Sequence, residues 1–433
     1  MKKFLFFLPV FLSMAAGGCT RNEESFETSS RTTHVPTEAT PIQEALSDLR
    51  QQLGAMRNST RSAAFDAETI AVLRRSDFGA ATRSDAAEGG DSLAYIVNFA
   101  DGGYAILGAD PHLPSVVAIV GKGEMTPGTL VAAKRNVDSG EQVDTPTYVD
   151  ALVANYILRS ADDPTPAARI SGEWVIEEHQ PSFVKTKWGQ GSTKFDTDSL
   201  YNKYCINDAG QLCKAGCVAI AMTQILLHNH KTFGKGPRSI TGMPLDWTKL
   251  DAAAGYEDLA DAPADIQDHA ARFIHEVGLA VDMDYGIYES ISGKNFVLAF
   301  MKSQAMNRIY TNPQIVKVPC SYYEDYPYDT DPILKMPMTE YADRYIRPMI
   351  CYQKIPIFME GSDGWYEQPG GHAWLIDGWM RKTRSAAPAG EEYIADYVYC
   401  NYGWNGDGDG LYAFGTFKNN YNYYNNIINY RLY

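Results

Sequence analysis

The stretch LCKAGCVAIAMTQIL, Leu212 to Leu226, decides how the second half of the chain is interpreted. Apolar residues recur at helical spacing from Cys217 onward, which predicts a helix that begins at this cysteine. A thiol in the first helical turn lies at the positive end of the helix dipole, where the thiolate is favoured. Gly216 permits a sharp entry and close approach by a ligand. Position alone still favours a buried structural cysteine over a nucleophile, because unpaired cysteines are commonly core residues.

A nucleophilic thiol needs a base, and most of the eight histidines are poor candidates. Five of them lie in or beside predicted helices or in connecting sequence, and we interpret them as surface or capping residues: His179, His228, His230, His269 and His275. His228 and His230 stand two positions apart, which on a helix does not present both rings to one metal ion. We therefore predict no metal site and no other cofactor.

His372 differs, because it follows QPGG and opens the predicted strand HAWLIDGW. The two glycines let an extended substrate approach the ring, and a strand holds the imidazole rigidly. Asn401 leads NYGWNGDGDG at the end of another predicted strand; its amide could accept a hydrogen bond from the imidazole, with Trp404 shielding the pair from water. Cys217 precedes His372 in the order and at the rough separation that papain-like Cys and His partners show.

Composition limits the classes of partner. The chain has 433 residues, 45% of them hydrophobic and 21% charged, which is the balance of a globular protein with one large core or two ordinary ones. Its formal net charge of -15 argues against nucleic acid or an anionic membrane surface as a partner, because a polyanion would be repelled.

The first residues, MKKFLFFLPVFLSMAAGGC, have the layout of a secretory signal: two lysines, a short apolar stretch and small residues before Cys19. Small residues directly before a cysteine resemble a bacterial lipobox, so we expect Cys19 to carry lipid; the alternative is ordinary signal cleavage nearby. The protein is expected to be exported from a bacterium and either anchored at the cell surface or outer membrane by that lipid, or released.

The remaining cysteines leave the disulfide pattern open. If Cys19 is lipidated, six remain in an oxidising compartment, where disulfides are the default interpretation of an even count. Cys205 and Cys213 flank INDAGQL and could close a small loop. If Cys217 stays a thiol, at least one more cysteine must be unpaired.

Hydrophobic periodicity and proline breaks divide the chain. Helical spacing in PIQEALSDLRQQLGAM and strand alternation around the turn Asp101-Gly102-Gly103 indicate a small α+β unit, and ADDPTPAARISGE then interrupts every period. Helices followed by strands make the larger second part a two-lobed α+β domain. We expect a C-terminal strand in NNYNYYNNIINYRLY. The predicted segments are a signal peptide at 1–19, a linker at 20–40, a first domain at 41–160, a second linker at 161–175 and a larger domain at 176–433.

Taken together, these motifs resemble the streptopain family of papain-fold cysteine peptidases, which are secreted as zymogens. KAGCVAIAMTQIL is similar to the family's nucleophile helix, GGHAWLIDGW to its histidine strand and NYGWNGDGDGLYAF to its tryptophan loop, although Tyr402 replaces a tryptophan there. KWGQGSTKFD resembles the segment with the oxyanion-hole glutamine, which would be Gln190. VGLAVDMDYGIYESISG resembles the loop on the substrate groove, so that Ser290, Ser292 and Gly371 become candidates for substrate contact.

The resemblance implies an activity. Cys217 would attack a peptide carbonyl, His372 would act as acid and base, Gln190 would stabilise the oxyanion, Asn401 would orient the histidine and Trp404 would shield it. LAYIVNFADGGYAILGADPHLPSVVAIVG resembles the family's inhibitory propeptide, so the first domain is expected to block the groove until the chain is cut between Arg159 and Lys187. The expected partners are protein or peptide substrates and the chain's own propeptide.

Two other functions remain open. A cell-wall peptidase on a papain-like core also places Cys before His, but such enzymes are usually compact and lack propeptides. A papain-fold binding protein without activity would be expected to have lost the nucleophile or the base, and this chain keeps both Cys217 and His372.

Overall fold

The computed structural model describes residues 41–56, 67–79, 91–141, 143–163, 169–170, 173–191, 200–320, 332–363, 371–387, 391–419 and 423–433. The predictions for the signal peptide, for Cys19 and for the linker at 20–40 lie outside these residues.

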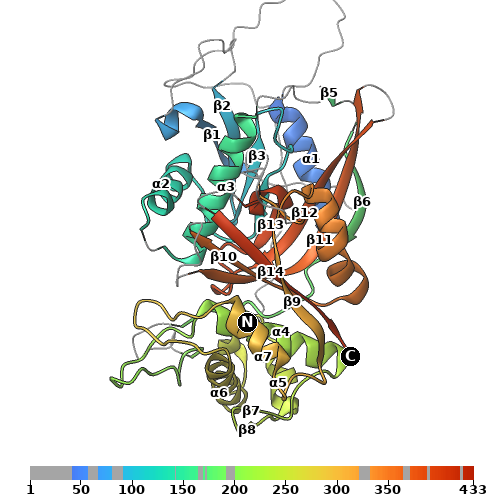
Figure 1. Ribbon diagram of the computed structural model, residues 1–433. Coiled ribbons are helices and arrows are strands. Elements are labelled where there is room, and N and C mark those ends of the chain that lie inside the picture. Colours follow the sequence, from blue (N-terminus) through green and yellow to red (C-terminus); the bar gives the residue numbers. More distant parts are fainter. Residues whose placement is uncertain are drawn as a thin grey trace, which may run out of the picture.

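A 12-stranded sheet is the main structural feature of the described residues (Figure 1). Its strands follow the order β1-β2-β3-β4-β13-β12-β11-β10-β14-β9, and β5 and β6 pair with β11. The bounds are β1 Ala67–Arg74, β2 Ser92–Phe99, β3 Tyr104–Gly108, β4 Ala118–Val120, β5 Arg169–Ile170, β6 Val175–Gln180, β9 Tyr310–Lys317, β10 Ile357–Asp363, β11 His372–Ala387, β12 Glu391–Asn401, β13 Gly410–Ala413 and β14 Tyr423–Leu432.

The helices form two groups, one packed beside the upper part of the sheet and one gathered in a lobe below it. In Figure 1 the helices of the middle of the chain gather below the sheet, and the earlier helices lie beside its upper part. The lower group is α4 Cys217–Phe233, α5 Trp247–Ala253, α6 Ala264–Ala280 and α7 Lys294–Lys302, next to the small hairpin of β7 Ser239–Ile240 and β8 Met243–Pro244. The upper group is α1 Pro41–Met56, α2 Pro127–Asp138 and α3 Thr145–Ala161. A short helix, α8 Met338–Tyr341, continues as wider turns to Gln353.

The predicted α+β class is confirmed, as are the helix that begins at Cys217, the hairpin of β2 and β3 and the C-terminal strand β14. The apolar segment GLYAFGTF forms a strand only over β13, and the residues that follow, Phe414–Phe417, form a 3-10 helix. The aromatic residues of this turn are buried, so they pack into the core without sheet pairing.

The first predicted domain is joined to the larger one through the sheet. Ile119 of β4 pairs with Leu411 of β13, so the strands predicted for the propeptide continue the sheet of the second part of the chain. Successive residues of β3 point to opposite faces of the sheet. Ile106 packs in the hydrophobic cluster that contains α3 and α4, and Leu107 packs in the cluster that contains α1. Helices α1 and α3 therefore cover opposite faces of the sheet.

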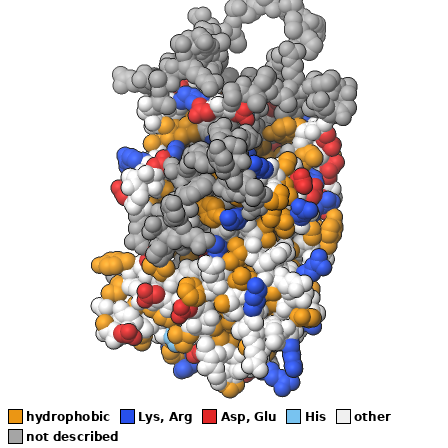
Figure 2. Space-filling view, in the orientation of Figure 1, with side chains coloured by type: hydrophobic (Ala, Val, Ile, Leu, Met, Phe, Trp, Pro, Cys, Tyr) orange, Lys and Arg blue, Asp and Glu red, His pale blue; other side chains and the backbone are white. Residues whose placement is uncertain are grey.

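The surface agrees with a globular, acidic chain. Figure 2 shows acidic and basic side chains interspersed on the face it presents, with no continuous basic patch there outside the grey atoms. Among the described residues, no helix is both long and apolar enough to cross a membrane.

Candidate active site

Cys217 is the first residue of α4, as the sequence predicted. Gly216 before it has φ 87°, a positive backbone angle that residues other than glycine rarely adopt. A Cβ atom at this position would lie 2.7 Å from Met283. The glycine therefore allows both the sharp entry and the close packing that place the thiol at the end of the helix. The Cys217 side chain is 8% exposed.

The backbone around His372 lies directly against the thiol. The N–H of Ala373 donates to Cys217 Sγ at 3.4 Å, and the Gly371 carbonyl lies 3.9 Å from the same sulfur. The start of β11 thus meets the start of α4. The sheet brings together two motifs that lie far apart in the sequence.

The imidazole of His372 contacts α3. Its Nδ1 lies 3.3 Å from Thr145 Oγ1, and its ring lies 5.0 Å from the ring of Tyr148, centroid to centroid. Burial lowers the pKa of His372 to about 4, with Asp144 opposing that shift. Burial also raises the pKa of the Cys217 thiol to about 12, and the Ala373 N–H opposes that rise. In this arrangement both groups are neutral at physiological pH.

Gln190 reaches the site through a segment anchored on β11. Asp377 accepts hydrogen bonds from Ser182 Oγ at 2.6 Å and from the Val184 N–H at 2.9 Å, which fixes the chain that leads to Gln190. The Gln190 carbonyl then accepts from the Ala215 N–H at 3.0 Å. This backbone bond places Gln190 beside the loop that enters α4. Its role in the oxyanion hole stays a prediction.

The predicted groove residues lie around the same loop. Ser290 Oγ donates to the Lys214 carbonyl at 2.6 Å. A Cβ atom added at Gly216 would lie 3.3 Å from the Cβ of Ser290. Ser290 therefore lies beside the loop that precedes Cys217, and its hydroxyl bonds to the backbone of that loop. Ser292 Oγ donates to the Val281 carbonyl, which is a hydrogen bond within the loop. Gly371 lies against the sulfur as described above.

Asn401 and Trp404 both have described contacts with groups other than His372. Asn401 Oδ1 accepts from Gln224 Nε2 at 3.2 Å, and its amide donates to the Thr186 carbonyl at 2.7 Å. Lys214 Nζ lies 5.7 Å from the centre of the Trp404 ring. His372 contacts α3 in this structure, and the orienting role of Asn401 and the shielding role of Trp404 stay predictions.

The sequence profile of the Peptidase C10 family matches residues 195–412, just over half of the chain. The chain belongs to the Peptidase C10 family. It is therefore a cysteine peptidase, and the resemblance to the streptopain family is confirmed. No curated protein matches the chain.

Two solved structures of Prevotella intermedia proteins are similar to this C10 peptidase. A fragment of prointerpain A is 16% identical, with a TM-score of 0.47, and the match covers 77% of this chain and 94% of that one. Active interpain A, a cysteine protease, is 19% identical, with a TM-score of 0.39, and the match covers 58% of this chain and 95% of that one.

Several residues that lie close to Cys217 or His372 in this peptidase were not predicted from the sequence. Thr145 and Tyr148 contact His372 from the first predicted domain, and nothing in their local sequence indicates a contact with a residue so distant. Glu289 and Glu360 lie close enough to Cys217 to raise the pKa of its thiol, after the larger effect of burial. Glu360 also accepts from Lys294, whose Nζ lies 3.2 Å away. The one indication in the sequence was for Glu289, which precedes Ser290 in the predicted groove loop.

The Tyr402 substitution is accommodated in the core. Its side chain is fully buried, with its ring 5.7 Å from that of Trp374 and 5.8 Å from that of Tyr412. It therefore packs behind β11 and supports the strand that carries His372.

The other described cysteines are all buried, and no disulfide bond joins them to one another or to Cys217: Cys205, Cys213, Cys320, Cys351 and Cys400. The loop between Cys205 and Cys213 is closed by a backbone bond, from the Cys213 N–H to the Cys205 carbonyl at 2.8 Å. In the described part of the chain, no group of three or more His, Cys, Asp or Glu residues could hold a metal ion.

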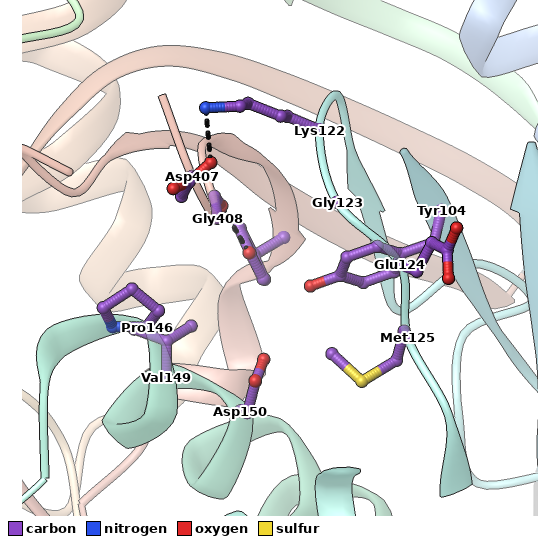
Figure 3. Close-up of a pocket in the computed structure, with 11 residues that line it drawn as sticks. Tyr104, Lys122, Gly123, Glu124, Met125, Pro146, Val149, Asp150, Asp407 and Gly408 are labelled. Carbon is purple, nitrogen blue, oxygen red and sulfur yellow. Dashed lines mark hydrogen bonds and ion pairs between the residues drawn. The ribbon is translucent and has the colours of Figure 1, made fainter. Parts of the chain in front are cut away.

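A cavity of about 140 Å³ lies between the two predicted domains (Figure 3). In Figure 3 the Asp150 carboxyl of α3 and the Tyr104 hydroxyl of β3 both point into it, and Lys122 pairs with Asp407 across its edge. Burial raises the pKa of Asp150 to about 7, and the neighbouring carboxylate of Asp144 contributes. An acid with a raised pKa is thus enclosed where α3 meets the rest of the chain.

We expect the folded, α3-docked chain to lose stability as the pH rises. Since the pKa of Asp150 is raised, the docked state binds the proton more tightly; the favourable contribution is complete below pH 3.8 and is lost as the pH passes through about 7. Thermal unfolding of the Cys217→Ala chain from pH 5 to pH 8 measures this slope. Asp150→Asn should flatten it, and equal slopes in both chains would contradict the assignment.

Proposed function

We propose that the protein is the latent form of an exported cysteine endopeptidase, with Cys217 as nucleophile and His372 as acid and base. The observation that supports this most directly is the contact between the first residue of α4 and the first residues of β11, where Ala373 donates to Cys217 Sγ at 3.4 Å. A thiol at a helix start beside a strand-borne histidine is the arrangement that thiol acyl transfer needs. Membership in a peptidase family gives the reaction class.

In the proposed reaction, the Cys217 thiolate attacks the carbonyl carbon of a peptide bond. The Gln190 side chain and the Cys217 N–H donate to the oxyanion, and protonated His372 gives its proton to the leaving amine as the C–N bond breaks. Water then attacks the thioester with His372 as base. The acid product leaves, and the thiol and imidazole are regenerated. No metal or organic cofactor takes part.

The contacts of α3 support latency. His372 is buried against Thr145 and Tyr148, and its proton affinity is lowered there, so it does not hold the thiol as a thiolate. The region of 41–160 that was predicted as the propeptide supplies this contact. Removal of α3 would leave the imidazole free to turn toward Cys217 and to recover a pKa suited to ion pairing.

The described contacts narrow the proposed activation cut. Arg159 donates to the Gly415 carbonyl from within α3, and β6 is paired with β11 over Val175–Gln180. A cut inside either element would disrupt these contacts. Strand β5, Arg169–Ile170, is also paired with β11. We therefore place the cut between Asp163 and Arg169, inside the window predicted from the sequence; N-terminal sequencing of the matured protein tests this.

Export and lipidation complete the proposal, on the evidence of residues 1–19 alone. Metabolic labelling with a fatty-acid analogue should mark the wild-type protein and leave Cys19→Ala unmarked. Equal labelling of both proteins would exclude Cys19 as the acceptor and leave ordinary signal cleavage.

Alkylation provides a pH test of latency. In the uncut chain, the rate of Cys217 labelling by iodoacetamide should rise with pH up to at least pH 10, because burial raises the pKa of this thiol to about 12. In the matured protein, the rate should already be high near pH 6. Peptide mass spectrometry of Cys217 at each pH gives both curves. A plateau below pH 8 in the uncut chain would show that the thiolate is already formed and that the chain is not latent in the way proposed.

A further inference from the structure

A buried ion pair joins α1 to the strand that carries His372. Lys382 of β11 pairs with Asp48 of α1, with side-chain exposures of 0% and 1%. Asp48 also accepts hydrogen bonds from Ser115 Oγ and, at 3.3 Å, from Gln52 Nε2. This carboxylate therefore has partners on α1 itself, before β4 and on β11.

The surroundings of the Lys382 ammonium group are aromatic and apolar. Lys382 Nζ lies 4.6 Å from the centre of the Trp174 ring and 5.4 Å from that of Tyr397. Burial lowers the pKa of Lys382 to about 8, although Asp48 opposes that shift. A buried charge of this kind is costly unless its partner stays in place. The aromatic rings around Lys382 fit an apolar helix face, and the buried ammonium group needs a carboxylate at the centre of that face.

This contact is remote from the contact that blocks the active site. Lys382 lies ten residues beyond His372 on β11, or about 33 Å along an extended strand. A register shift between Ile376 and Gly378 lies between the two residues. His372 meets α3 on one face of the sheet, and Lys382 meets α1 on the other. Loss of the α3 contact therefore need not break the α1 contact.

We propose that the sheet surface formed by Lys382, Trp174, Met380 and Tyr397 is a docking surface for an amphipathic helix with a central carboxylate, and that its occupant is α1 of the chain's own first domain, retained after the chain is cut. The proposal rests on the proposed zymogen function. Leu49 and Leu53 of α1 supply the apolar face, and Gln51 Nε2 donates to the Trp174 carbonyl at 2.7 Å. Asp48 supplies the carboxylate that the buried ammonium requires.

The test uses the full chain with Cys217→Ala, so that it cannot cut itself, and with residues 164–168 replaced by the recognition sequence of a specific protease. After the cut, gel filtration and surface plasmon resonance measure how much of the first segment stays bound and how tightly. The parent chain should keep the segment. Asp48→Asn should weaken its retention by at least about 100-fold, because it leaves the Lys382 ammonium buried without its counter-charge.

Two further variants separate docking from misfolding. Asp48→Leu combined with Lys382→Met removes both charges and should restore retention to within about tenfold of the parent, since a buried pair can be replaced by apolar residues of similar size. Glu44→Gln is the matched surface control: Glu44 lies 3.5 Å from Arg384 at an exposed edge, and its loss should change retention less than about threefold. If Asp48→Asn does not fold, retention is measured instead in the double variant and in Ser115→Ala, which removes one hydrogen bond to Asp48.

The proposal is overturned if the parent segment dissociates after the cut, or if Asp48→Asn retains it as tightly as Glu44→Gln. It is also overturned if the double variant fails to recover retention while the uncut chain is folded. Retention is measured without activity, so retention of the segment supports the docking surface whether or not the protein hydrolyses peptides. If the Cys217 form hydrolyses nothing after the segment has been displaced, the proposed function is contradicted and the docking surface stands.

Discussion

Replacement of Cys217 by alanine is expected to lower peptide hydrolysis by the matured protein at least about 10⁴-fold. The substitution removes the sulfur that forms the thioester, and a nucleophile of this kind is responsible for most of the rate enhancement in related mechanisms. Casein digestion and a fluorogenic peptide assay measure the loss. The fold should survive, because the change removes one atom from a side chain that is already small.

Cys351→Ala is a matched control for that experiment. Cys351 is also 8% exposed, and burial raises the pKa of its thiol to about 12, as it does for Cys217. The two cysteines differ in their surroundings, since only Cys217 begins α4 and contacts the backbone beside His372. Activity that survives in Cys217→Ala and disappears in Cys351→Ala would refute the assignment of the nucleophile.

Tyr148→Ala is expected to have the opposite effect and to make the uncut chain active. Tyr148 is fully buried; its ring packs on His372, and its hydroxyl donates to the Ser362 carbonyl at 3.2 Å. Truncation of a buried aromatic residue costs about 3–5 kcal/mol. If most of that cost falls on the docking of α3, the population of open molecules rises by about 100-fold or more. Hydrolysis by the uncut chain, made resistant to cleavage at 164–168, measures the increase.

Leu130→Ala distinguishes release of His372 from general weakening of the first domain. Leu130 is fully buried in α2, and its loss costs about 2–5 kcal/mol in the core of the same region. Activity should rise much less in Leu130→Ala than in Tyr148→Ala, because α3 keeps its contact with the imidazole. An equal rise in the two variants would mean that the stability of the whole domain, and not the contact with His372, keeps the chain latent.

Much of the site was predictable because local sequence carried the signal. Gly216 followed by an apolar helical pattern placed Cys217 at the start of α4, and two glycines before an alternating segment placed His372 at the start of β11. Helix and strand starts depend mainly on glycine geometry and on hydrophobic period, both of which are local. The chemistry of acyl transfer followed from pairing a thiol with a base.

The contacts of Asn401 were not predictable in the same way. Its place at the end of β12 was correct, yet its amide bonds to Gln224 and Thr186, which come from α4 and from the segment before it. A side-chain amide bonds to whichever groups the packed elements bring within about 3 Å. Sequence spacing does not determine that distance.

The sequence by itself determined the reaction class, the α+β class of the fold, and the positions of Cys217 and His372 at the starts of α4 and β11. Only the tertiary structure decided the state of the site. Thr145 and Tyr148 reach His372 because β4 pairs with β13 and carries α3 over the sheet, and Asp48 reaches Lys382 from the other face. These contacts join residues hundreds of positions apart, and burial shifts the pKa values of His372 and Cys217. Periodicity and capping are properties of neighbours along the chain, whereas burial and charge pairing depend on the whole fold.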